Sequence, residues 1–101
     1  MVLQIVTFPI KPGQKAAFQK ALMSAVEATR KETGVNLYLP GWEIEDENTC
    51  ILIEEYTDQA GLDSHLAENH TKNFLAELDQ YLSARPELRV YQVDSLDVQQ
   101  I

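Results

Sequence analysis

Cysteine and positive charge are both scarce in this chain of 101 residues. The single cysteine, Cys50, cannot form an internal disulfide, and it lies in an apolar run where a thiol behaves as a small hydrophobic group. Eight lysines and arginines stand against sixteen aspartates and glutamates, which gives a net charge of −8. Because the chain shows no basic stripe, we expect neither a nucleic acid nor an anionic membrane surface as a partner.

Long apolar runs are also missing. No window approaches the roughly 18 apolar residues that a membrane span requires, and the N-terminal stretch is too short and too poor in basic residues for a targeting signal. Glycine and proline number only four each in a chain that is 45% hydrophobic, which makes wholesale disorder a poor interpretation. We therefore expect residues 1–101 to form one small domain located in the cytoplasm.

Hydrophobic periodicity and turn signals predict the order of the secondary-structure elements. Four runs are rich in β-branched and aromatic residues, as strands are. Two longer runs repeat apolar residues at helical spacing, and the second is interrupted partway. The predicted strands cover residues 2–8, 37–45, 49–56 and 88–93, and the predicted helical regions cover residues 14–33 and 59–82.

Three local signals refine this order. Gly34 directly follows the first predicted helix and suits its C-cap. Pro40 and Gly41 predict a bulge or an edge position in the second strand. Asn69 is expected to interrupt the second helical region.

The resulting β-α-β-β-α-β order is typical of the ferredoxin-like arrangement, an α+β fold with one antiparallel sheet and helices on one face. The strands lack the apolar-in, polar-out alternation of a sheet with one solvated face. Because two helical regions can cover only one side, we expect the other face to pack against a second subunit in a homodimer. The alternative is a monomer with an apolar sheet face.

The residues in this order resemble the antibiotic biosynthesis monooxygenase (ABM) superfamily of dimeric α/β barrels. The matching pieces are KPGQKAAFQKAL, TRKETG and EEYTDQAGLDSHLAENHTKNF. Family members commonly have a Lys-Pro-Gly turn, a helix that ends in an Arg-x-Glu-Pro-Gly-like motif, and an acidic residue and Trp before a His-x4-His region. This chain has Thr33 where Pro is usual and Tyr56 where Trp is usual. Haem-degrading relatives carry Asn on the first strand, whereas Gln4 is the only side-chain amide there, which argues against haem breakdown.

The resemblance implies an enzyme that needs no metal, flavin or haem. Relatives that oxygenate aromatic polyphenols rely on a substrate that, once deprotonated, can itself give an electron to O2. We therefore expect a cofactor-independent monooxygenase that acts on an electron-rich aromatic or quinol-type small molecule with O2. The alternatives are an isomerase or tautomerase of a small oxygenated metabolite, and a non-catalytic dimeric ligand-binding module.

The two histidines are the first candidates for the site. His65 borders an apolar stripe, and it could act as a general base or orient a substrate oxygen; the alternative is a packed histidine satisfied by backbone groups. In an unbroken helix, His70 would lie about 140° around the axis from His65, so joint action requires a break near Asn69. Their spacing is not i, i+4 and no Cys or third His completes a set, so we expect no metal site.

Glu54 and Tyr56 complete the predicted catalytic group. They share one face of a strand that ends just before the histidine region, and Glu54 could orient a histidine or accept a substrate proton. The alternative for Glu54 is a salt bridge with Arg30 or Arg89. Glu32 is interpreted only as part of a charge pattern at the end of the first helix.

Aromatic side chains are expected to form the walls of the pocket. Phe74 and Trp42, together with His70, are the predicted substrate-binding residues, because aromatic rings can stack on a planar substrate. Aromatic residues on strands and helix faces are more often part of the core, and that is the alternative for each ring.

Overall fold

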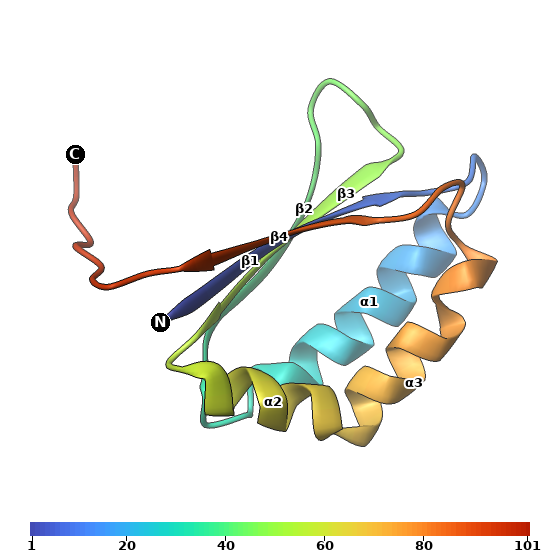
Figure 1. The fold of residues 1–101 in the computed structure, drawn as a ribbon. Coiled ribbons are helices and arrows are strands. Elements are labelled where there is room, and N and C mark those ends of the chain that lie inside the picture. The colour runs from blue at the N-terminus through green and yellow to red at the C-terminus, as the bar shows by residue number, and fades with distance from the viewer.

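The computed structural model describes residues 1–101 as a four-stranded antiparallel sheet with helices on one face (Figure 1). The strand order is β2-β3-β1-β4. The elements are β1 (Val2–Pro9), α1 (Lys15–Thr29), β2 (Val35–Trp42), β3 (Thr49–Tyr56), α2 (Gln59–Ala67), α3 (Asn69–Glu77), a 3₁₀ turn η1 (Leu78–Gln80) and β4 (Glu87–Gln92). The predicted ferredoxin-like α+β fold and its element order are confirmed.

The sheet buries every second residue toward the helices. In β3 the buried residues start at Cys50 and include Leu52, Glu54 and Tyr56. The antiparallel register places Val6 of β1 opposite Leu52 on the same face. This period of two is the alternation that a strand imposes on its side chains. The carboxylate of Glu54 is therefore directed into the layer between sheet and helices.

Aromatic packing fills the layer between α1, α3 and the sheet. Phe18 of α1 is fully buried, and its ring lies 5.5 Å from that of Phe8 and 6.1 Å from that of Phe74. Burying a side chain of this size contributes about 1.5–3 kcal/mol. The position of α3 on the sheet is therefore fixed mainly by apolar contact.

The break between α2 and α3 falls at Glu68. Its backbone is extended (φ −68°, ψ 142°), which ends α2 at Ala67 and lets α3 start at Asn69. The interruption predicted near Asn69 is thus confirmed to within one residue. At the start of α2, the side chain of Asp58 accepts a hydrogen bond from the backbone N–H of Gly61, as an N-cap residue does.

Two local predictions are corrected by the structure. The first helix ends at Thr29 with Arg30 as its C-cap, so Gly34 is not a cap. The irregularity of β2 lies between Val35 and Leu37, and Pro40 pairs regularly with β3. The edge position predicted for this strand is confirmed, because β2 is at one end of the sheet.

Gly34 instead makes room for close contact with α2. A Cβ atom built on Gly34 would lie 2.6 Å from the Cα of Gly61. Real Cβ atoms essentially never come this close to backbone atoms. The chain that leaves α1 can therefore approach α2 only because both positions are glycine.

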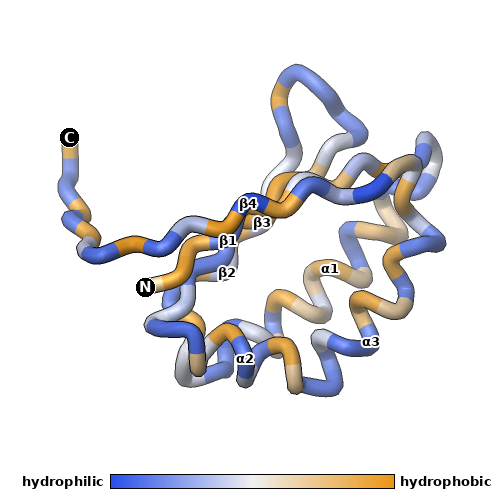
Figure 2. The backbone as a smooth tube through the Cα atoms, in the orientation of Figure 1, coloured by the Kyte–Doolittle hydropathy of each residue, from blue (hydrophilic) through white to orange (hydrophobic).

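The helix-free face of the sheet carries a row of apolar residues. Ile5 pairs with Ile53, and Ile53 pairs with Leu39, which is 47% exposed. After β4 the chain runs away from the body of the molecule, and it exposes Leu96 and Val98 (Figures 1 and 2). None of the helices has the length and apolar character needed to cross a membrane.

We predict that Gly34→Ala lowers the free energy of unfolding by about 1–3 kcal/mol, because the added methyl group overpacks a contact between two backbones. Gly41→Ala is the matched control, since a Cβ there has no neighbour within 4 Å. Urea denaturation at one fixed protein concentration measures the free energy of unfolding of the wild type and of both variants. Equal stability of the two variants would contradict the role given to this contact.

Candidate functional site

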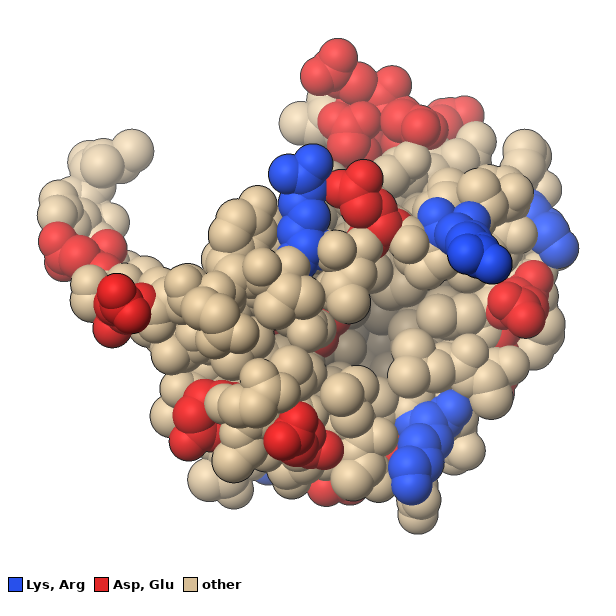
Figure 3. Space-filling model, viewed as in Figure 1, with Lys and Arg blue, Asp and Glu red and all other residues tan.

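A cavity of about 270 Å³ lies between the sheet and the helices. Figure 3 shows a hollow on this face of the molecule, bordered mostly by uncharged side chains. Its lining is mainly apolar and comes from all the layers of the fold. The apolar lining includes Val6, Phe8, Leu52, Phe74, Leu78 and Leu88, and the polar lining includes Gln4, Thr29, Tyr38, Glu54, His65 and Thr71.

His65 forms part of the wall of this cavity, and one nitrogen of its ring contacts two other side chains. Only 3% of the residue is exposed. The Nδ1 atom lies 3.0 Å from Oε2 of Glu32 and 3.3 Å from the hydroxyl of Thr71. A carboxylate can only accept, so Nδ1 carries the proton and donates to Glu32. The lone pair is then on Nε2, which makes no hydrogen bond within the protein.

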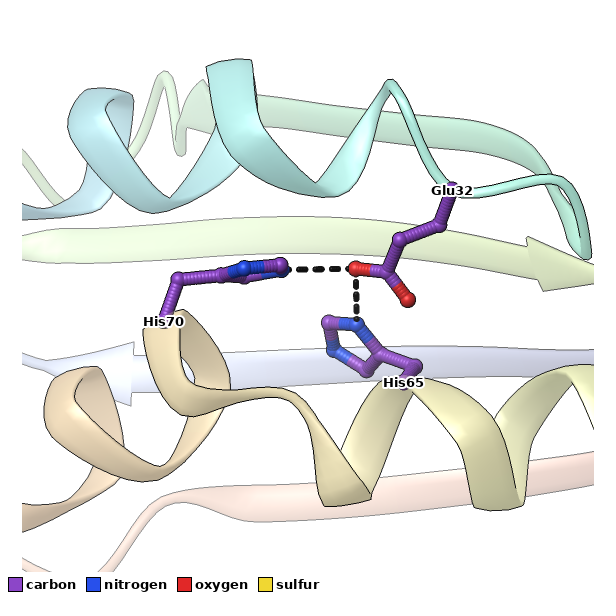
Figure 4. A group of neighbouring side chains, drawn as sticks. All are labelled: Glu32, His65 and His70. Atoms are coloured by element: carbon purple, nitrogen blue, oxygen red, sulfur yellow. Dashed lines mark hydrogen bonds and ion pairs between the residues drawn. The ribbon is translucent and has the colours of Figure 1, made fainter.

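Glu32 is the residue that joins the two histidines. It lies in the turn after α1, and its Oε2 atom accepts from Nδ1 of His65 and, at 2.7 Å, from Nε2 of His70 (Figure 4). Its Oε1 atom is buried and has no hydrogen-bond partner. The side chain is only 11% exposed, so this carboxylate depends on the two imidazoles to replace water.

Glu54 forms a second buried group with two tyrosines. Burial raises the pKa of Glu54 above its ordinary value, while the hydrogen bond from the Tyr56 hydroxyl and the proximity of His65 act in the opposite direction. Burial and the nearby carboxylates raise the pKa values of Tyr38 and Tyr56 far above the ordinary value of a phenol. Both phenols therefore remain protonated, and Tyr38 can offer its hydroxyl to the cavity.

The structure brings some of the predicted site residues together and separates others. His65, Glu54 and Phe74 all line the cavity. Tyr56 is fully buried beneath it and reaches the site through its bond to Glu54. His70 opens instead to a separate surface hollow, in contact with Glu32.

Trp42 lies apart from the cavity. Its ring packs on Phe18, its indole N–H donates to Gln19, and the amine of Lys15 lies 4.4 Å from the ring centroid. The structure therefore gives Trp42 a place in the edge of the core, next to a different small hollow.

The salt bridge considered for Glu54 is wrong. Arg30 donates both of its hydrogen bonds to the backbone carbonyl of Tyr38, and Arg89 pairs with Glu87 on the exposed strand β4. The helix-end interpretation of Glu32 is also wrong, because its carboxylate turns inward to the histidines. Glu32 lies 33 residues before His65, and no periodic signal in the sequence connects them.

The same three side chains could hold a metal ion. One ligand atom from each of Glu32, His65 and His70 lies within 4.8 Å of the others. The break at Glu68 turns His70 back toward α1, so the two histidines meet despite a spacing that an unbroken helix would separate.

Comparisons with known proteins agree with the fold and identify the protein family. The family model described as "Antibiotic biosynthesis monooxygenase" (ABM) matches residues 1–77. A solved structure of a conserved protein from Methanosarcina mazei Go1 is 26% identical, with a TM-score of 0.86 over 93% of this chain and 94% of that one. The structure of Rv0793 from Mycobacterium tuberculosis is 24% identical, with a TM-score of 0.86 over 98% of each chain, and it supports the fold alone.

The chain belongs to the antibiotic biosynthesis monooxygenase family. Among curated proteins, the Bacillus subtilis (strain 168) protein named "Putative monooxygenase YcnE" is 29% identical over 75 residues, which are 74% of this chain and 79% of that protein. The family expected from the sequence motifs is thereby confirmed.

We predict that Glu54→Gln raises the free energy of unfolding at pH 7 by on the order of 1 kcal/mol, because it removes a buried charge and keeps an acceptor for Tyr56. Folding raises the pKa of Glu54. The free energy of unfolding therefore falls as the pH rises above the pKa that this carboxyl has in the unfolded chain, because the folded state ionises less readily. The gain should therefore shrink as the pH falls toward about 4.

Urea denaturation of wild type and variant at several pH values measures this difference. Glu27→Gln, which removes an exposed carboxylate from α1, is the matched control. A gain that is the same at every pH would contradict the assignment to the ionisation of Glu54.

Proposed function

We propose that this protein is a monooxygenase that acts on an electron-rich aromatic or quinol-type small molecule with O2 and needs no bound cofactor. The observation that carries the proposal is the orientation of His65. Its Nδ1 is tied to a buried carboxylate, and the residue forms part of the wall of an apolar cavity. Membership of the ABM family supports the reaction class.

His65 is the proposed general base. The bond to Glu32 holds the ring in the tautomer whose Nε2 accepts a proton, and it stabilises the imidazolium that forms afterwards. Thr71 borders the same Nδ1 atom and restricts rotation of the ring. A general base positioned in this way contributes typically 10²–10⁴-fold to a rate.

The reaction begins when the base removes an acidic proton from the substrate, for example from the CH2 group of an anthrone. The resulting carbanion gives one electron to O2, and the two radicals combine to a peroxide at that carbon. The imidazolium returns the proton to the peroxide, and loss of water leaves a carbonyl group. The balance is CH2 + O2 → C=O + H2O, with O2 as the oxidant and the substrate as the only source of electrons.

The remainder of the cavity suits such a substrate. Phe74 and Leu52 offer apolar walls to a planar ring. No lysine or arginine lines the cavity, so an anionic phosphorylated substrate has no partner there. The protonated Tyr38 hydroxyl can donate to the oxygen on which negative charge develops. Glu54, hydrogen-bonded to Tyr56, is the polar floor of the same space.

The active form is proposed to be a homodimer joined through the helix-free sheet faces. The apolar row of Ile5, Ile53 and Leu39 would be unusual on a solvated face. Association would bury this row, and the exposed tail after β4 could then lie along the partner subunit.

We predict that His65→Ala abolishes O2 uptake with a hydroquinone or anthrone substrate, while the dimer and the fold persist. Glu32→Gln should lower kcat by about 10²-fold or less, because it weakens the orientation of the base without removing it. An oxygen electrode, with chelator-treated protein, measures both.

Product formation that continues unchanged under nitrogen would replace the oxygenase with an isomerase that uses the same base. O2 uptake that persists in His65→Ala at the wild-type rate would contradict the role of His65. The circular dichroism spectrum and dimer size of each variant verify that it is folded.

We predict that Ile53→Lys converts the dimer to a monomer, because it places a charge in the centre of the apolar row. Ala17→Lys, on the exposed side of α1, is the matched control and should remain dimeric. Sedimentation analysis measures the mass of each. A wild-type chain that sediments as a monomer would overturn the proposed assembly.

A further inference from the structure

We propose that Glu32, His65 and His70 form a binding site for one divalent transition-metal ion such as Zn²⁺, and that an ion at this site switches off His65 as a base. The metal site is inferred from the geometry of the three side chains alone. The inhibition rests on the proposed function, because it concerns the proton that His65 would accept from the substrate. The ion is an inhibitor in this proposal, and the oxygenation needs none.

The ligand atoms are close to the arrangement that such an ion requires. Two imidazole nitrogens and a carboxylate oxygen are a ligand set that zinc prefers, usually with water in a fourth position. The Glu32 oxygen lies 3.0 and 2.7 Å from the two nitrogens. Ligands in a tetrahedral zinc site are roughly 3.4 Å apart. Along these two contacts the side chains need to separate by less than about 1 Å, and all three ligand atoms already lie within 4.8 Å of one another.

The charge of the cluster also favours a cation. The Glu32 carboxylate is nearly buried, its Oε1 atom has no partner, and no lysine or arginine forms an ion pair with it. Glu68 lies beside His70, with its Oε2 atom 4.0 Å from Nδ1. A metal ion bound at Nε2 of His70 would leave Nδ1 protonated and directed toward this acceptor, which is a common supporting contact in metal sites.

The cluster is accessible from solvent without passage through the substrate cavity. His70 is 25% exposed at its side chain and lines a polar surface hollow together with Glu32 and Glu68. His65 lines the apolar cavity on the other side. An ion and a water ligand can therefore enter through the hollow and reach Glu32.

Metal binding and base catalysis exclude each other at His65. To bind an ion, Nδ1 must present its lone pair, so the ring proton moves to Nε2. An imidazole in this form faces the cavity with an N–H donor and can no longer accept a proton from the substrate. The inhibition thus follows from the tautomer and requires no movement of the backbone.

The test is a titration of chelator-stripped protein with Zn²⁺ followed by calorimetry, and with Co²⁺ followed by its visible absorption. We expect one ion per chain, and at least tenfold weaker binding in Glu32→Gln and in His70→Ala. Glu27→Gln, which removes an exposed carboxylate from α1, is the matched control and should bind as wild type does. His70 is partly exposed, so its variant should fold even if Glu32→Gln does not.

Absence of binding at millimolar zinc, or equal affinity in wild type and both ligand variants, would overturn the site. O2 uptake provides the second readout, in which saturating zinc should abolish turnover and chelation should restore it. Tight binding at these residues with undiminished O2 uptake would leave the site standing and overturn the base role of His65. Loss of uptake in His65→Ala together with no zinc binding would leave the proposed function standing and overturn the metal site.

Discussion

The arrangement of the site depends on the burial of one carboxylate, that of Glu32. A carboxylate that is buried without hydrogen bonds to replace its hydration strongly destabilises the folded state. Glu32 does so with two imidazoles that belong to different helices, His65 on α2 and His70 on α3. The turn after α1 and both of these helices are therefore held at one point. Removing either histidine would leave the carboxylate more poorly satisfied.

Two features of the backbone make this contact geometrically possible. The extended conformation of Glu68 ends α2 and redirects α3, so that His70 faces the same oxygen as His65. The glycines at positions 34 and 61 let the turn after α1 approach α2 with no Cβ between them. Apolar packing of Phe18 and Phe74 then fixes α1 and α3 on the sheet. The cavity is the space that these constraints leave between α2, α3 and the strands, with the lone pair of His65 on the nitrogen that is free of Glu32.

Much of the fold could be predicted from the sequence, because the local periodicity of apolar residues indicates where strands and helices lie. The order of elements, the edge position of β2 and the break near Asn69 all follow from patterns within short windows. The site could be predicted only in part. His65, Glu54 and Phe74 line one cavity, whereas Trp42 lies apart from it, and the catalytic and binding roles given to them stay predictions. Glu32 was missed because its partners are more than thirty residues away, and its own segment offers only a charged helix end.

The function proposed for the site depends on the tautomer of His65, which Glu32 holds with the proton on Nδ1 and the lone pair on Nε2. Long-range ¹H–¹⁵N NMR of the chelator-stripped protein reports this tautomer directly. The chain has two histidines, so the spectrum of His70→Ala identifies the signals that belong to His65. We expect a protonated Nδ1 and an unprotonated Nε2 for the neutral ring of His65, with this preference lost in Glu32→Gln. A proton found on Nε2 in the wild-type protein would overturn the assignment of the tautomer.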